Sequence, residues 1–137
     1  MESTLGQIGQ LNLIVLFYII GRYYLEIPPD SLIFEVMNKL NLLPKDMKAR
    51  SLSDKEVVLS YKDALMALDI FYQAKLAFLG WEGWGQYKNG SLGHSDYQGT
   101  ESIVRKIDEP WNEYIKRGYG LVKETIKKDY KNWEESE

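Results

Sequence analysis

The first strong pattern along the chain is a nearly continuous apolar run over Leu11–Ile20. The hydroxyl of Ser3 or Thr4 suits an N-cap, and the apolar side chains would surround the axis of a helix. We therefore expect a central buried helix from Ser3 or Thr4 to about Leu25. The alternative is a buried strand over Leu13–Ile20, because this run is rich in β-branched and aromatic residues and periodicity alone does not separate the two.

A short helix and a linker are expected next. Pro28–Pro29 ends the first element, and Asp30 or Ser31 begins a helix through Leu40, because proline suits the approach to a first helical turn. Lys45–Ser51 is polar and of mixed charge, so we interpret it as a linker.

A capping box marks the clearest predicted helix. Ser53 and Glu56 have the spacing in which each side chain satisfies the backbone amide of the other residue, and Gly80 suits a C-terminal cap. Two adjoining apolar seams between them predict a helix from Ser53 to Gly80 with two packing partners. The seams are Val58, Tyr61, Leu65, Leu68, Tyr72, Leu76 and Leu79, and Val57, Ser60, Ala64, Ala67, Phe71, Ala74 and Phe78.

The segment Gly80–Gly99 holds six of the eleven glycines, two of the four tryptophans and the only histidine. A loop of this length in a compact domain is usually functional or disordered. Asn89 and Gly90 are typical of a tight turn, which predicts a small β-hairpin between Gln86–Lys88 and Ser91–Gly93.

The last predicted helix carries apolar residues whose phase continues across Pro110. We expect it to begin at Thr100 and to run to about Trp133. Pro110 requires either a bend in one long helix or a new helix with the proline in its first turn. Gly118 and Gly120 weaken the same helix.

These segments predict a single all-α domain over residues 1–137, a bundle of four to five helices. The glycine- and aromatic-rich loop, with its hairpin, would join the third and fourth helices. A chain of this length suits one domain. A membrane span needs about 20 apolar residues, and extending the first run to Leu25 admits Asn12, Gly21 and Arg22, so we expect no integral membrane insertion.

Composition excludes several kinds of chemistry. The absence of cysteine excludes disulfides, thiolate zinc sites and a cysteine nucleophile, and it fits a reducing compartment such as the cytoplasm or a virion. One histidine and no Glu-x-x-His pattern predict no metal site. Gly80, Gly83 and Gly85 follow a predicted helix, whereas a dinucleotide loop follows a strand, so we expect no small-molecule cofactor.

The aromatic loop is the predicted partner-binding site. Exposed tryptophan and tyrosine combine a large contact area with a polar group and are typical binding hot spots. The alternative is that Trp81 and Trp84 fold back and cover the end of the bundle. The candidate partner-binding residues are Trp81, Trp84, Tyr87, His94 and Tyr97.

Two further functions are weighed against partner binding. His94 is the only candidate general base, with Ser91, Ser95 and Asp96 as neighbours, but a catalytic triad is defined by geometry rather than by sequence proximity. We therefore assign no catalytic residue and keep a small enzyme using His94 as an alternative.

A stripe of lysines along the last predicted helix supports a second alternative, a nucleic-acid-associated or coat-type protein. The net charge of −3 is too balanced for a strong basic footprint. The lysines are Lys116, Lys123, Lys127 and Lys131.

The leading hypothesis is a non-enzymatic interaction or assembly protein. Such a chain would be a small structural subunit of a virus or phage, or an inhibitor of another protein. It would use the Gly80–Gly99 loop and its apolar helix seams to bind a protein partner or a second copy of itself.

Overall fold

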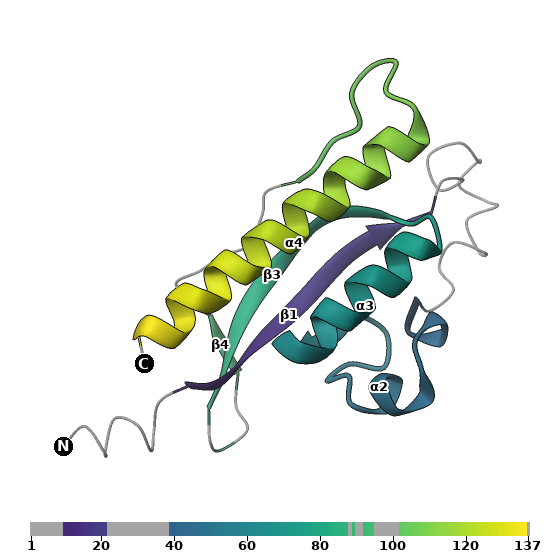
Figure 1. Ribbon diagram of the computed structural model, residues 1–137. Helices are drawn as coiled ribbons and strands as arrows, with labels where there is room; N and C mark the ends of the chain where they lie inside the picture. The colour runs from purple at the N-terminus through teal and green to yellow at the C-terminus, as the bar shows by residue number, and fades with distance from the viewer. Residues whose placement is uncertain (1–9, 22–38, 88, 90–91, 95–101, 137) are drawn as a thin grey trace.

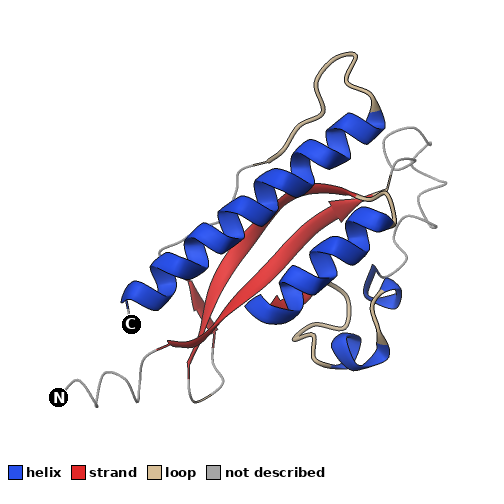
Figure 2. Ribbon diagram, in the orientation of Figure 1, coloured by secondary structure: helices blue, strands red, loops and turns tan. Residues whose placement is uncertain are grey.

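The computed structural model describes residues 10–21, 39–87, 89, 92–94 and 102–136. In this part of the chain a twisted antiparallel sheet carries two long helices on one face (Figures 1 and 2). The elements are β1 (Gln10–Ile20), the 3-10 helix η3 (Lys39–Leu42), α2 (Lys45–Ala49), β2 (Val58–Ser60), α3 (Tyr61–Gln73), β3 (Ala77–Tyr87), β4 (Leu92–His94) and α4 (Trp111–Ser136).

The four strands lie in the order β2-β1-β3-β4, and every neighbouring pair is antiparallel. The prediction of an all-α bundle of four to five helices is therefore wrong, and the described chain is a mixed α/β structure. None of its described helices combines the length and apolar character that a membrane span requires.

The first correction concerns β1, which replaces the expected central helix. β1 is hydrogen-bonded to β2 on one edge and to β3 on the other, and over residues 13–15 its side chains are buried on both faces, whereas on the face away from α3 and α4 Leu16 is half-buried and Tyr18 is exposed. A strand buried on both faces gives a nearly continuous apolar run rather than an alternating one. The alternative of a strand over Leu13–Ile20 is thus confirmed.

Several expected boundaries lie outside the described residues. They are the helix start at Ser3 or Thr4, its end at Leu25, and most of the short helix expected from Asp30 or Ser31 through Leu40. The last two residues of that short helix, Lys39 and Leu40, lie in the 3-10 helix η3. The linker prediction is wrong in one respect, because Lys45–Ala49 forms α2 and buries Met47.

The helix predicted from Ser53 to Gly80 is divided into three elements. The Ser53 hydroxyl does accept hydrogen bonds from the amides of Lys55 and Glu56, but the chain then enters β2 instead of a helix. The actual N-cap is Ser60, which accepts from the amide of Asp63. The hydrogen bonds of a capping box also form in an isolated turn, as they do at Ser53. The residues after this turn form a strand because β2 pairs with β1.

The predicted glycine loop begins as a strand. Gly80 to Tyr87 belong to β3, which pairs with β1 along nearly its whole length. The predicted hairpin is confirmed in its antiparallel pairing of β3 with β4, with Gln86 opposite Leu92, while the tight turn predicted at Asn89 and Gly90 lies partly outside the described residues. Glycine is disfavoured in strands by propensity, so the assignment depends on a partner strand that a sequence pattern does not reveal.

α4 begins at Trp111 rather than at Thr100, which lies outside the described residues. The carbonyl of Pro110 accepts hydrogen bonds from the amides of Glu113 and Tyr114. The alternative of a new helix starting at the proline is therefore confirmed. The segment before it is irregular, because a proline disfavours helical backbone at the preceding residue.

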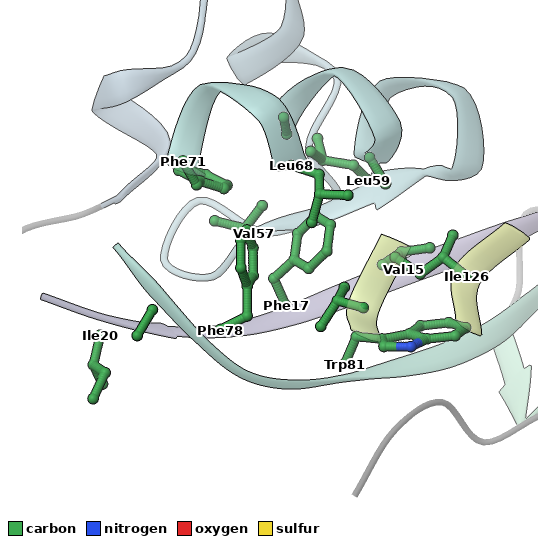
Figure 3. Packing of buried hydrophobic residues seen from close by; sticks show 14 of the residues in the cluster. Val15, Phe17, Ile20, Val57, Leu59, Leu68, Phe71, Phe78, Trp81 and Ile126 are labelled. Carbon is green, nitrogen blue, oxygen red and sulfur yellow. The ribbon is translucent and has the colours of Figure 1, made fainter. Parts of the chain in front are cut away.

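The core lies between the sheet and the two long helices. Phe17 contacts both Phe71 and Phe78, with ring centroids 6.3 and 5.5 Å apart. In Figure 3, Trp81 on β3 lies against Ile126 of α4. This arrangement covers one face of the sheet, here called the inner face, with α3 and α4; we call the opposite face the outer face (Figures 1 and 2).

Candidate functional site

Trp81 lies in the core and not on an exposed loop. Its side chain is 1% exposed, and its indole N–H donates a 2.9 Å hydrogen bond to the hydroxyl of Thr125 on α4. The expectation that Trp81 is exposed for a partner is corrected, since the indole joins the sheet to the helix. The alternative, that the tryptophans cover the end of a helical bundle, is right only in that Trp81 packs against the protein itself, since it lies between the sheet and α4.

Trp84 points to the other side of the sheet. Side chains alternate along a strand, and the β1–β3 register is regular from Trp81 to Trp84, so these two residues face in opposite directions. Trp84 is half-buried and lies opposite Ile14 in the β1–β3 register. The two tryptophans that the sequence grouped together therefore have different surroundings, and only Trp84 contributes to the surface of the outer face.

The remaining aromatic-loop residues are described only in part. Tyr87 ends β3 and pairs with Gln10, and the backbone of His94 pairs with Trp84 in the β3–β4 register. Their side chains lie outside the described part, as does all of Tyr97. Partner binding by these three residues, and catalysis by His94, stay predictions.

An apolar groove lies beside Trp84 on the outer face. Leu16 and Val58 are opposite each other in register and share its floor with Trp84. Leu52 and Glu56 complete the lining, and the groove has a volume of about 220 Å³. Pockets for drug-sized ligands are typically about 300–1,000 Å³, so this groove suits one or two side chains rather than a cofactor.

The loop that walls the groove is held by hydrogen bonds. The amide of Leu52 donates to the carbonyl of Val58 at 2.9 Å. The hydroxyl of Ser51 donates to the carbonyl of Ser53 at 2.8 Å and accepts from the amide of Val58. These bonds place the half-exposed side chain of Leu52 beside β2, so the loop that forms the groove wall is held in a fixed position against the sheet.

The carboxylates of Glu56 and Glu82 belong to residues at or next to the apolar floor of the groove. The phenol of Tyr18 donates a 2.8 Å hydrogen bond to Glu82, whose neighbour across the strand pair is Leu16. The bond to Glu82, burial and the negative charges of Glu82 and Glu56 raise the pKa of Tyr18 to about 12. This phenol stays protonated at neutral pH, and the face combines apolar surface with negative charge.

A second hollow adjoins the groove at Leu52. It has a volume of about 450 Å³ and lies between α2 and the loop that follows it. Its charged side chains, from Lys45, Lys48 and Asp54, are exposed. Within the described residues no group of three or more histidine, cysteine or acidic side chains is placed to hold a metal ion.

The lysine stripe lies on α4 as the spacing predicted. Lys116, Lys127 and Lys131 are exposed. Lys123 is engaged within the fold, because its ammonium donates to the Tyr119 hydroxyl at 3.0 Å and lies 3.9 Å from a carboxylate oxygen of Asp69. Nucleic-acid binding through the stripe stays a prediction. Lys123, one of its four lysines, already contacts Asp69 and Tyr119.

Sequence reasoning missed a second surface feature, the turn over Lys106–Glu109. The helix expected from Thr100 would have included Val104 and Ile107 among its apolar residues, but both are exposed. The sequence Asp-Glu-Pro at 108–110 is the signal that indicates a turn here.

A clamp of ion pairs and hydrogen bonds holds that turn. The guanidinium of Arg117 donates to both carboxylate oxygens of Glu109, at 2.8 and 2.9 Å, and to the carbonyl of Val104 at 2.7 Å. The amide of Lys106 donates a further hydrogen bond to the carboxylate of Glu109, at 2.9 Å. These contacts lower the pKa of Glu109 to about 2, so the clamp stays charged at neutral pH.

No protein-family model, curated protein or solved structure matches the chain.

Proposed function

We propose that this protein is a non-enzymatic interaction or assembly protein, and that the outer-face groove beside Trp84 receives an apolar side chain of a protein partner. The observation that carries the proposal is the groove itself, with Leu16, Val58 and Trp84 on its floor. Tryptophan is one of the residue types enriched at binding hot spots. A virion or the cytoplasm suits a cysteine-free chain.

The groove has the size and position of a protein-binding site. Both long helices cover the inner face, so the outer face carries no described long helix (Figure 2). Its apolar floor is built on two paired strands, β1 and β2, and on β3. Rigid strands position an anchor residue with little loss of conformational entropy on binding, which favours recognition of a preformed surface.

The charge of the face supports a choice of partner. Glu56 lines the groove and Glu82 lies across the strand pair from Leu16. Complementary charge steers a partner and fixes its register. We infer that the bound segment carries an apolar side chain next to a lysine or an arginine.

The test is site-specific crosslinking in the native source. A photoreactive amino acid replaces Leu52, which is 49% exposed in the groove wall, and in a matched control it replaces Met66, which is 54% exposed on α3. The expected result is a partner adduct at position 52 that Trp84→Ala removes. Equal adducts at both positions, or adducts at position 52 that survive Trp84→Ala in a folded variant, would overturn the proposal.

A further inference from the structure

The Lys106–Glu109 turn presents an isoleucine on a rigid support. The amide of Glu109 donates to the carbonyl of Lys106 at 3.1 Å and closes the turn. Asp108 has a φ of 66° at its third position, a conformation that aspartate tolerates better than most residues. The Arg117 clamp fixes the last residue of the turn to α4. Ile107, at the second position, therefore has a defined place.

Ile107 is 93% exposed, the highest value among the exposed large hydrophobic residues described. The loop that carries it projects beyond the first turn of α4 (Figure 1). An apolar side chain held in water on an ordered turn gains by entering an apolar pocket, and a rigid turn loses little conformational freedom when it does so. The turn thus has the features of a preorganised binding element.

The groove beside Trp84 complements this turn in size. Dry apolar cavities of about 150 Å³ accept a benzene-sized group. A groove of about 220 Å³ lined by Leu16, Leu52 and Val58 therefore has room for one isoleucine side chain.

The turn and the groove are also complementary in charge. Lys106 is exposed directly before Ile107, and Glu56 is exposed in the lining of the groove. Glu109 is already neutralised by Arg117. Asp108 is the other exposed charge in the turn, and a docked turn must direct it away from Glu56 and Glu82.

We propose that the partner is a second copy of this chain, with Ile107 of one molecule inserted in the outer-face groove of the next and Lys106 placed beside Glu56. This inference rests on the proposed function of the groove. Because the two surfaces differ, the contact is heterologous, and its repetition gives a ring or an open chain of molecules.

A symmetric dimer through two outer faces is disfavoured by charge. It would bring Glu56 and Glu82 of both molecules to one interface, and like charges across an interface oppose association. The head-to-tail contact avoids this repulsion because it places a lysine at the acidic groove.

Sedimentation velocity over a concentration series tests the contact. One anchor side chain predicts weak association, so the series extends to about 1 mM protein. Ile107→Asp removes the inserted side chain, and Leu52→Lys blocks the groove and repels Lys106. Each variant is expected to weaken association at least about tenfold. The matched control, Met66→Lys, makes the same kind of change on α3 and is expected to associate like the wild type.

Mixing the two defective variants is the decisive step. Ile107→Asp keeps an intact groove and Leu52→Lys keeps an intact turn, so an equimolar mixture should form dimers and nothing larger. The inference is overturned if the wild type stays monomeric, if the mixture forms no dimer, or if Met66→Lys is as defective as Leu52→Lys. If the wild type stays monomeric but the position-52 crosslink still requires Trp84, the groove binds another protein and only the self-association fails.

Discussion

The indole of Trp81 and the hydroxyl of Thr125 form a 2.9 Å hydrogen bond that joins β3 to α4 across 44 positions of sequence. The same hydroxyl lies 2.9 Å from the carbonyl oxygen of Leu121, to which it donates. A buried indole N–H is thus satisfied by a helix side chain whose own proton returns to the helix backbone. The Trp81–Thr125 hydrogen bond holds α4 over the inner face of the sheet. Trp84 lies on the outer face.

Replacing Thr125 with valine should destabilise the fold. The substitution keeps the shape of the side chain and leaves the Trp81 N–H buried without this acceptor, which costs about 1–3 kcal/mol. Chemical denaturation measures the free energy of unfolding. Thr125→Ser, which retains the hydroxyl, is the control, and its free energy of unfolding should fall clearly less than that of Thr125→Val. Equal decreases in both variants would show that the hydrogen bond is not what Thr125 contributes to stability.

The two glycines within α4 should respond differently to a larger side chain. A Cβ at Gly118 would lie 3.2 Å from the carbonyl oxygen of Phe78, whereas at Gly120 it would meet no atom within 4 Å. Gly120→Ala should therefore stabilise by about 0.5–1 kcal/mol through helix propensity. Gly118→Leu should destabilise by about 1–3 kcal/mol because it forces the helix away from β3.

Thermal unfolding of both leucine variants checks this comparison. Gly120→Leu is the matched control, since it adds the same side chain to the same helix at an exposed position. If Gly118→Leu melts at the same temperature as Gly120→Leu, the close approach of α4 to β3 is not as described.

The Glu109–Arg117 pair should make stability depend on acid pH. Its hydrogen bonds hold the pKa of Glu109 at about 2 in the folded state, below the ordinary value of 4.5. A carboxylate with a depressed folded pKa stabilises the fold fully above its unfolded pKa, and this contribution is lost as the pH falls from about 4.5 to about 2. The stability difference between wild type and Glu109→Gln should therefore shrink over that range.

Denaturation at a series of pH values measures that difference. Glu124→Gln is a suitable control, because it makes the same change at an exposed glutamate of α4. A wild-type advantage over Glu109→Gln that stays constant from pH 7 to below pH 3 would contradict the assigned role of the clamp.

The sequence predicted the elements that depend on local chemistry. The pairing of β3 with β4 follows from the turn residue Asn89. The helix was expected to begin at Thr100, and of the two alternatives left open at Pro110 the structure has the new helix, which starts at Trp111 directly after the residue that lacks an amide. The apolar seam through Ala64, Ala67 and Phe71 is fully buried in α3, because its spacing matches the helical period whatever the neighbouring elements are.

The elements that depend on distant partners were not predictable in the same way. β3 contains Gly80, Gly83 and Gly85, which propensity assigns to a loop, and it is a strand because β1 provides the hydrogen-bond partners. The separation of Trp81 from Trp84 onto two faces follows at once from that strand. With the segment interpreted as a loop, both tryptophans looked equivalent, so the groove beside Trp84 was not foreseen.

Fluorine NMR of the protein labelled with fluorotryptophan tests the outer-face binding site most directly. Trp84 lies at the groove, while Trp81 is buried between β3 and α4 and serves as the internal reference. With resonances assigned by single substitutions, the Trp84 signal should shift or broaden as partner is added or as the protein concentration is raised, and the Trp81 signal should stay in place. A Trp84 signal that is unchanged in a complex would contradict the assignment of this face.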